Sequence, residues 1–327
     1  MTHKNILVIQ TAFIGDAILA SSVLEKLHLF FPKSPITLLV RKGNEALYAE
    51  HPFLYQTLVW NKQEGKYKSL FQLLKVVRKQ HFDTVINLHR FASSGFITAF
   101  SKAAYTCGYN KNPFSFLFNV KVKHIIGDGQ HEIQRYNDLI EDITDKSIAK
   151  PKLYPSFKQF TKVEKYIIPP FVCMAPSSVW ETKQLPKHKW IELCNKMISN
   201  TTIYLLGAAS DMALCEHIQS QSIHAKVVIL AGKLSLLESC ELMKHAHMNY
   251  VNDSAPLHLA SSVNAPTTAF FCSTIPEYGF YPLSTNSTVI EVKDLDCRSC
   301  GLHGYKSCPK NNFRCGNNIN IENIKPV

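Results

Sequence analysis

The sequence predicts an α/β protein with two doubly wound halves, and two observations carry this prediction. Short runs of branched apolar residues recur along the chain, such as NILVIQ at 5–10 and FVCMA at 171–175. Runs of this kind are typical of parallel strands that are buried on both faces. The segments between them repeat apolar residues every three or four positions, as amphipathic helices do. Strands that alternate with helices form parallel sheets covered by those helices.

The elements fall into two series, separated by a segment of different composition. Helices are expected over 16–31 and 69–80 in the first series. From about 124 to 170 the alternation fails, and turn residues, charges and four of the sixteen prolines indicate a linker. We therefore expect domains at 1–160 and 161–327, facing each other across a cleft. The expected strands lie at 5–10, 36–40, 57–60 and 84–88, and then at 171–175, 201–207, 227–232, 248–252 and 267–271.

Composition limits the classes of partner. The chain has 327 residues, 46% of them hydrophobic, and its 36 Lys and Arg exceed its 25 Asp and Glu. The excess of positive charge favours anionic partners, namely phosphorylated small molecules, a membrane surface or nucleic acid. No run of eighteen apolar residues and no signal-peptide pattern is present, so we expect a cytoplasmic protein. Six cysteines in apolar segments are expected to be buried thiols: Cys107, Cys173, Cys194, Cys215, Cys240 and Cys272.

The first strand leads into TAFIGDAILA, which offers a carboxylate at the start of a helix. Gly15 would let the chain turn tightly, and Asp16 would lie at or just inside the amino end of the helix. Asp16 is then either an ordinary helix cap or a carboxylate that takes a proton. A dinucleotide-binding loop is the other interpretation, but this turn lacks the three spaced glycines that a pyrophosphate turn uses.

The second half repeats polar residues at its strand ends, where open α/β sheets bind their ligands. In APSSVWETKQLPKHKW, the hydroxyls of Ser177 and Ser178 are followed by Lys183, a point charge suited to phosphate. In VNDSAPLHLA, a strand ends just before Asp253 and Ser254, and the helix that follows can offer backbone amides to an anion. His258 lies one turn into that helix, where a histidine is more often packed than functional. Gly207 marks a further strand-end turn.

Six segments, in this order, resemble those of a known family. They are ILVIQTAFIGDAILASSVLEKLHLFFP, INLHRFASSGFITAF, APSSVWETKQLPKHKW, YLLGAASD, LAGKLSLLESCELMKHA and VNDSAPLHLASSVNAPTTAFF. The chain is similar to the ADP-heptose:lipopolysaccharide heptosyltransferases of glycosyltransferase family nine, from residue 5 to about 315. HEIQRYNDLI at 131–140 resembles the heptosyltransferase II type, which adds the second heptose.

The resemblance implies a GT-B fold and a reaction. The amino-terminal domain would bind the acceptor and the carboxyl-terminal domain the nucleotide sugar. The implied reaction is an inverting, metal-independent transfer of heptose from ADP-heptose to the inner core of lipopolysaccharide, at the inner leaflet of the cytoplasmic membrane. By position, Asp16 matches the family's general base and Lys183 its donor-phosphate lysine, while Asp253, Ser254 and His258 match the donor-binding turn. No cofactor is expected for catalysis.

The carboxyl-terminal cysteines form a separate cluster in the sequence. CRSCGLHGYKSCPKNNFRC contains four thiols at close spacing, which could bind a structural zinc ion or form a redox-sensitive cluster. A similar tail occurs in some members of the family, so we expect no catalysis there. The four residues are Cys297, Cys300, Cys308 and Cys315.

Three alternatives to heptose transfer stay open. A transferase of the same kind could use another sugar donor. An NAD-dependent oxidoreductase would need a glycine-rich first turn, which this chain lacks. A nucleic-acid-binding protein would draw on the charge and on the cysteine tail, but the lysines are dispersed and form no basic stripe, so nucleic acid is not an expected partner.

Overall fold

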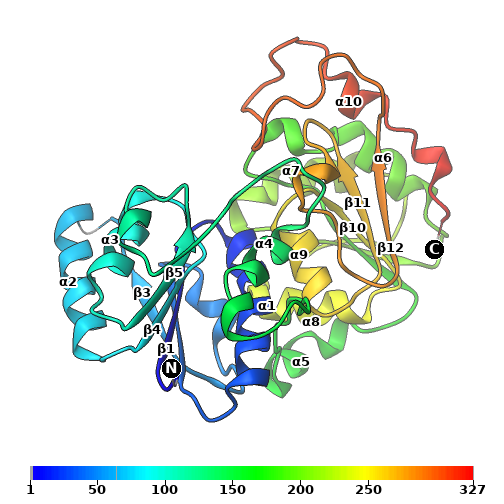
Figure 1. Cartoon of the computed structure of the whole chain (residues 1–327). Coiled ribbons are helices and arrows are strands. Elements are labelled where there is room, and N and C mark those ends of the chain that lie inside the picture. The colour runs from blue at the N-terminus through cyan, green and yellow to red at the C-terminus, as the bar shows by residue number, and fades with distance from the viewer. Residues whose placement is uncertain (1–2, 64, 327) are drawn as a thin grey trace. The chain divides into compact units, whose positions relative to one another are not determined.

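The computed structural model describes residues 3–63 and 65–326 and divides the chain into two compact units, Met1–Tyr154 and Pro155–Val327 (Figure 1). Within the described residues, each unit holds one six-stranded sheet in which every pairing is parallel. The strand order is β3-β2-β1-β4-β5-β6 in the first unit and β12-β11-β10-β7-β8-β9 in the second. Both orders are the doubly wound 3-2-1-4-5-6 arrangement. The predicted fold class is therefore confirmed.

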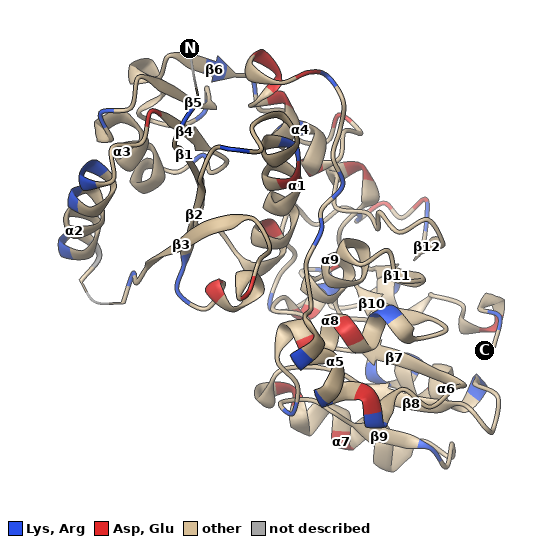
Figure 2. Cartoon of the chain, turned by 90° about the horizontal axis from the view of Figure 1, so that it is seen from below, with Lys and Arg blue, Asp and Glu red and all other residues tan. Residues whose placement is uncertain are grey.

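The strands and helices of the first unit begin and end as follows. Its strands are β1 (Ile6–Gln10), β2 (Ile36–Arg41), β3 (Leu54–Trp60), β4 (Thr84–Asn87), β5 (Tyr105–Tyr109) and β6 (Val120–Val122). Its helices are α1 (Ile14–Phe30), α2 (Lys66–Lys79), α3 (Ala92–Phe100) and α4 (Glu132–Asp138). Helices α2 and α3 cover one face of the sheet, and α1 packs with α4 on the other (Figures 1 and 2).

The second unit repeats this plan with more helices. Its strands are β7 (Phe171–Ala175), β8 (Thr202–Leu205), β9 (Val227–Ile229), β10 (Asn249–Asn252), β11 (Thr267–Phe271) and β12 (Ser287–Glu291). Its helices are α5 (Phe157–Val163), α6 (Lys187–Lys196), α7 (Met212–Gln221), α8 (Leu236–His245), α9 (Ala255–Ser262) and α10 (Arg314–Asn317).

Two sequence-based expectations were wrong. The segment 124–170 is not merely a linker, because it contains helices α4 and α5. His131 is the N-cap of α4 and forms a capping box. Its ring accepts from the backbone N–H of Ile133, and its backbone N–H donates to the side chain of Gln134. Strands β5, β6 and β12 were also not expected.

The end of the first unit is tied to α1 by polar contacts. Lys26, 2% exposed, donates from Nζ to the carbonyl oxygens of Asp145 and Ser147 at 2.6 and 2.5 Å. Farther along, the Tyr154 hydroxyl donates to the Glu25 carboxylate at 2.8 Å. These bonds satisfy a buried ammonium group and fix the chain up to the end of the unit.

Apolar side chains from the strands and their covering helices form the core of each unit. All five residues of β1 are buried, and so are all five of β7. In the second unit the Trp190 ring meets Phe270 edge-on, with ring centroids 5.4 Å apart. The six cysteines expected in the core are buried free thiols, as predicted. Across residues 3–63 and 65–326, no helix is both long enough and apolar enough to cross a bilayer.

Candidate functional site

The predicted site residues lie where the strand order of each sheet reverses. In the first unit β1 is flanked by β2 and β4, and in the second unit β7 is flanked by β8 and β10. The loops after β1 and β4 leave in opposite directions, as do those after β7 and β10, and ligands of doubly wound sheets bind in the crevice this creates. Asp16 follows β1, while Ser177 and Ser178 follow β7, and Asp253 follows β10.

The structure decides the local role of Asp16. Helix α1 begins at Ile14, and its N-cap is Phe13, which makes no side-chain cap. Asp16 is therefore the third residue of the helix and is not its cap, although its charge suits the positive end of the helix dipole. Gly15 lies inside the first turn and does not have the positive φ that would require glycine, so the tight turn expected there was wrong.

A chain of hydrogen bonds leads from the end of β1 to the Asp16 carboxylate. The backbone N–H of Ala12 donates to Gln10 Oε1 at 3.0 Å, which fixes the orientation of that amide. Gln10 Nε2 must then donate to Tyr136 Oη, 2.8 Å away. Tyr136 Oη in turn lies 3.5 Å from Asp16 Oδ1, at the long limit for a hydrogen bond.

The direction of the last bond follows from the others. Because the Tyr136 oxygen already accepts from Gln10, its own O–H is left to donate to Asp16. Burial raises the pKa of Tyr136 well above its usual value, and the charge of Asp16 raises it further. Tyr136 therefore keeps its proton. Helix α4, which sequence analysis missed, supplies this residue. The only earlier sign of this segment was the resemblance of residues 131–140 to the heptosyltransferase II type.

Positive groups surround the same strand ends. Lys62 Nζ donates to the carbonyl of Thr11 at 3.0 Å, and the Arg41 guanidinium lies over the Phe13 ring at 5.2 Å from its centroid. His89, which follows β4, has its Nδ1 3.0 Å from Thr11 Oγ1. Burial lowers the pKa of His89 to about 4, and the nearby charges of Lys62 and Arg90 act in the same direction. The strand ends thus present fixed cations beside a neutral histidine.

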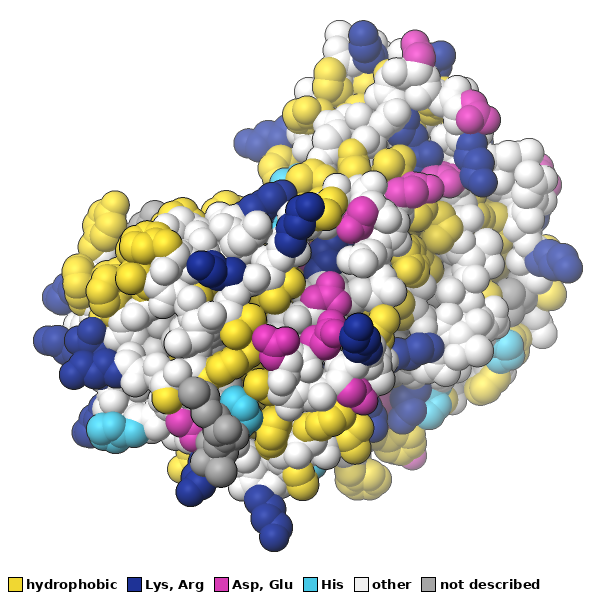
Figure 3. Space-filling view, in the orientation of Figure 1, with side chains coloured by type: hydrophobic (Ala, Val, Ile, Leu, Met, Phe, Trp, Pro, Cys, Tyr) yellow, Lys and Arg dark blue, Asp and Glu magenta, His cyan; other side chains and the backbone are white. Residues whose placement is uncertain are grey.

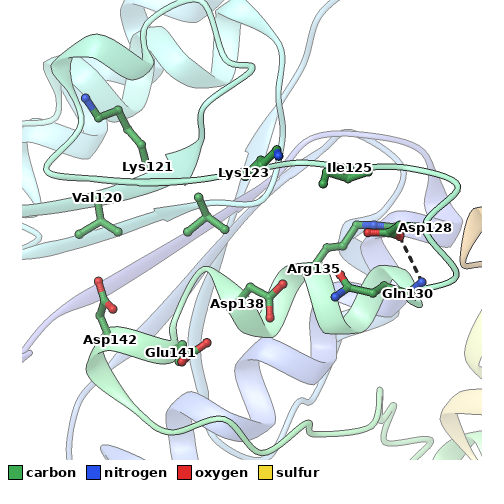
Figure 4. Close-up of a pocket in the computed structure, with 11 residues that line it drawn as sticks. Val120, Lys121, Lys123, Ile125, Asp128, Gln130, Arg135, Asp138, Glu141 and Asp142 are labelled. Carbon is green, nitrogen blue, oxygen red and sulfur yellow. Dashed lines mark hydrogen bonds and ion pairs between the residues drawn. The ribbon is translucent and has the colours of Figure 1, made fainter.

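A cavity of about 560 Å³ lies beside α4, between this helix and the segment after β6 (Figure 4). Arg135, which lines this cavity, forms two ion pairs, with Nη2 2.8 Å from Asp128 Oδ1 and Nη1 2.9 Å from Glu132 Oε2. Asp138 and Asp142 add further carboxylates to the lining. This ion-pair network holds the amino-terminal turn of α4, and hence helps to fix the helix that carries the tyrosine next to Asp16.

In the second unit, Asn252 joins the two strand-end loops. Its Nδ2 donates to the carbonyl of Pro176 at 2.8 Å, and its Oδ1 accepts from the backbone N–H of Leu185 at 2.9 Å. Asn252 is fully buried, so both of its polar ends are satisfied inside the protein. The loop after β7 is thereby held against the end of β10.

Lys183 and Asp253 form an ion pair across these loops. Lys183 Nζ lies 2.6 Å from Asp253 Oδ2, and the side chains are 15% and 5% exposed. Thr274, which follows β11, donates from Oγ1 to the same carboxylate oxygen at 2.6 Å. Sequence analysis had treated Lys183 as a free charge and did not identify Thr274. The lysine is held at the strand ends by a nearly buried carboxylate.

A second carboxylate organises the turn after β8. Asp211 accepts from the Ser177 hydroxyl at 2.8 Å and from the backbone N–H of Ala208 at 2.8 Å. A Cβ on Gly207 would come within 2.9 Å of Asp211 Oδ2, so a larger residue here would displace this carboxylate. The carbonyl of Ser178 accepts from the Gln184 side chain at 2.7 Å. These contacts position Ser177, Ser178 and Gly207 in one network of loops.

Ser254 and His258 differ in their surroundings. Ser254 is the N-cap residue of α9, but its side chain makes no cap and instead lies near the carbonyl of Ser177. His258 is 4% exposed, and its ring lies 6.2 Å from that of Phe280. We predicted a histidine that faces the donor, whereas the structure buries this side chain.

The four carboxyl-terminal cysteines were considered as a zinc site or a redox-sensitive cluster. Among the described residues, no group of three or more His, Cys, Asp or Glu side chains is arranged to hold a metal ion. Cys297, Cys300 and Cys308 are partly exposed, while Cys315 packs into the apolar core of the second unit. All four are free thiols.

An arginine holds the start of the cysteine segment. Arg298, whose side chain is 6% exposed, pairs with Glu291 at 2.6 Å and donates to the carbonyls of Thr274 and Cys272. These bonds join the start of the cysteine segment to the ends of β11 and β12.

Comparison with known proteins agrees with these features. The model of the family described as glycosyltransferase family 9 (heptosyltransferase) matches residues 70–305. The chain belongs to this family. This glycosyltransferase family 9 chain is 26% identical over 309 residues to lipooligosaccharide heptosyltransferase 2 of Haemophilus influenzae, with 88% of each chain covered.

Solved structures show that the glycosyltransferase shares the GT-B fold. It matches the E. coli ADP-heptose lps heptosyltransferase II with a TM-score of 0.76 and 19% identity, over 95% of this chain and 96% of the other. It also matches E. coli heptosyltransferase WaaC with ADP-2-deoxy-2-fluoro heptose, with a TM-score of 0.71 and 16% identity, over 87% and 92% of the two chains.

Proposed function

We propose that this glycosyltransferase transfers heptose from ADP-heptose to the inner core of lipopolysaccharide with inversion at the anomeric carbon. The observation that carries the proposal is the coincidence of the family match with a carboxylate, Asp16, at the strand-order reversal of the first unit. The similarity to a lipooligosaccharide heptosyltransferase 2, and to a solved heptosyltransferase with an ADP-sugar analogue, supports this choice of acceptor and donor. Nucleic acid is not among the partners that we propose.

Asp16 would act as the general base. An acceptor hydroxyl must lose its proton as it attacks the anomeric carbon, and a carboxylate held by a helix amino terminus and a tyrosine O–H is fixed for that task. We assign the first unit, with Arg41, Lys62 and Arg90, to an acceptor that carries acidic groups.

The second unit would bind the ADP portion of the donor. As the bond to the sugar breaks, the diphosphate gains negative charge, and Lys183 supplies a cation at the strand ends. The amino terminus of α9, which Ser254 does not cap, adds backbone dipoles suited to phosphate. Ser177, Ser178, Gly207 and Asp253 would shape the same loops, and His258 would support α9 from within. The mechanism calls on these protein groups and on no cofactor.

The enzyme would work in the cytoplasm, at the inner leaflet of the cytoplasmic membrane, because its proposed acceptor is lipid-linked. Isothermal titration of the full chain with ADP, UDP and NAD tests the proposed function. We expect ADP to bind and the other two to bind much more weakly. Tight binding of NAD would contradict the proposal, and preference for UDP would point to a different sugar donor.

Tyr136 offers a test of the proposed base. In the Tyr136→Phe variant the ring stays but the Asp16 carboxylate loses a donor that favours its charged form. The acidic limb of the kcat/KM profile should therefore move to higher pH, by roughly half to one unit, the scale of one hydrogen bond. The change is measured by assaying heptose transfer from pH 4 to 9, a range chosen to cover that limb.

Tyr109→Phe is the matched control. Tyr109 is also buried in the first unit, and its hydroxyl has no hydrogen-bond partner in the part of the chain that the structure describes. This variant should leave the pH profile in place. If both variants, or neither, shift the acidic limb, Tyr136 does not act through Asp16.

A further inference from the structure

One face of the first unit exposes aromatic side chains that its core does not explain. Helix α2 buries Leu70, Leu73, Leu74 and Val77 against the sheet. On its outer side, Tyr67 and Phe71 are 72% and 56% exposed. Next to α2, Phe100 at the end of α3 is 37% exposed, and Phe116 after β5 is 71% exposed. We call this set, with the residues that join it, the α2–α3 face. It is defined by Tyr67, Phe71, Phe96, Phe100, Phe114, Phe116 and Leu117.

Four rings of this face, those of Phe71, Phe96, Phe100 and Phe114, are in contact with one another. Phe96 is the centre, with its ring centroid 5.5 Å from that of Phe71 and 4.9 Å from that of Phe100. Phe114 lies 6.0 Å from Phe96 and 6.1 Å from Phe100. Arg78 joins the ends of the two helices by donating from Nε to the carbonyl of Phe100 at 2.7 Å. The face therefore contains a connected cluster of four rings, and not only a scatter of single exposed residues.

The same face is strongly basic. Residues 65–122 contain nine Lys and Arg side chains and a single acidic one, Asp83. That carboxylate accepts from the backbone N–H groups of Lys4 and Asn5, beside the amino end of β1. Figure 2 shows Lys and Arg along α2 with no acidic residue among them, and Figure 3 shows hydrophobic side chains gathered beside them. The exposed cations of α2 include Lys68, Lys75, Arg78 and Lys79.

This combination identifies the kind of partner. Aromatic rings with nearby Lys and Arg are suited to the interface of a bilayer, where rings enter the headgroup region and cations meet anionic lipid. Protein–protein interfaces are depleted in lysine, whereas this face exposes Lys68, Lys75 and Lys79 beside its rings. We propose that the α2–α3 face docks the glycosyltransferase on an anionic membrane surface.

The proposal extends the proposed function, since a lipid-linked acceptor needs an enzyme at the membrane, but vesicle binding can be measured without turnover. The full chain is sedimented with vesicles of phosphatidylcholine alone or with phosphatidylglycerol. We expect binding only when the anionic lipid is present, and we expect added salt to weaken it. Binding to neither kind of vesicle would overturn the proposal.

Two sets of substitutions test the face itself. The pair Lys68→Glu and Lys75→Glu should lower the partition onto anionic vesicles by roughly tenfold or more, because each reversal replaces attraction by repulsion. Phe116→Ser should lower it several-fold, and since Phe116 is 71% exposed, the variant should fold normally. Ile223→Ser is the matched control, because Ile223 is 86% exposed in the second unit. Its binding should equal that of the parent chain.

The competing surface is α5, which carries Phe157, 81% exposed, beside Lys158. If Phe157→Ser with Lys158→Glu abolishes vesicle binding while the α2–α3 variants keep it, the α2–α3 face is not the docking surface. Sedimentation velocity without lipid covers another outcome: a dimer that Phe116→Ser dissociates would make the face a contact between copies of this chain and overturn the proposal.

The outcome is separable from that of the proposed function. Heptose transfer to a deacylated, water-soluble acceptor should be unchanged in the α2–α3 variants, because none of the substituted residues is assigned to catalysis. Failure of ADP to bind, together with normal vesicle binding, would leave the surface in place and remove the transferase proposal. Normal ADP binding with no vesicle binding would keep the transferase proposal and remove the docking surface.

Discussion

Asp16→Asn is expected to lower turnover by roughly a hundredfold or more while ADP affinity stays nearly unchanged, because a general base typically contributes on this scale. Asparagine keeps the size of the side chain and can still accept from Tyr136, but it cannot take a proton from the acceptor. The residues proposed to bind the donor belong to the other unit, so ADP binding should be unaffected. Steady-state kinetics and isothermal titration on the same preparation measure the two effects.

A matched substitution separates the loss of the proposed base from the mere loss of a negative charge. Asp142→Asn removes an exposed carboxylate of the same unit, to which no role is assigned, and should keep normal turnover. Near-normal turnover in Asp16→Asn would show that Asp16 contributes only to the helix dipole. In that case an effect of Tyr136→Phe on the pH profile would need another explanation.

Lys183→Ala is expected to weaken ADP binding by roughly tenfold or more, the scale of one charge-assisted hydrogen bond. It should also lower the stability of the empty protein, by about 3 kcal/mol, because Asp253 would lose its cation while 5% exposed. Titration with ADP and thermal or urea unfolding measure the two effects. ADP affinity of the parent chain should fall as salt rises, because salt screens the attraction.

The double variant of Lys183→Ala with Asp253→Asn distinguishes the two roles of the lysine. An amide at position 253 needs no cation, so much of the lost stability should return, while weak ADP binding should persist. If ADP affinity recovers together with stability, Lys183 only supports the fold of the loops and does not contact the diphosphate.

The sequence predicted those parts of the fold that have a strong local signal. Strands β1, β2, β7 and β11 are short runs of mostly apolar or β-branched residues, and they were expected almost to the residue. Strand β5, YTCGY, contains a glycine and polar side chains, and β6 has only three residues. Their identity as strands comes from pairing with β4 and with each other, which a local pattern does not show.

The same division applies to the site. Asp16, Lys183 and Asp253 could be proposed because each follows a recognisable strand within a motif. Their partners could not, because these come from distant parts of the chain: Tyr136 is 120 residues from Asp16, and Gln10 is 126 residues from Tyr136. The one signal in the sequence for a role of Gln10 was its place as a polar residue at the end of the apolar strand β1. The segment around Tyr136 was assigned to a linker because turn residues and charges outweighed its short helical pattern.

The bonds that fasten the end of the first unit to α1 bear on the order of events during synthesis. Its six strands all precede residue 123, and the Lys26 and Glu25 contacts close the unit by Tyr154. Each unit is one uninterrupted stretch of chain, so the first has everything it needs to form its sheet while the ribosome is still making the second. Domains generally fold as units in this way, beginning from the amino terminus. A nascent first half that has already formed its sheet would leave only the edge strands β3 and β6 open to wrong pairing during the remaining translation of this chain.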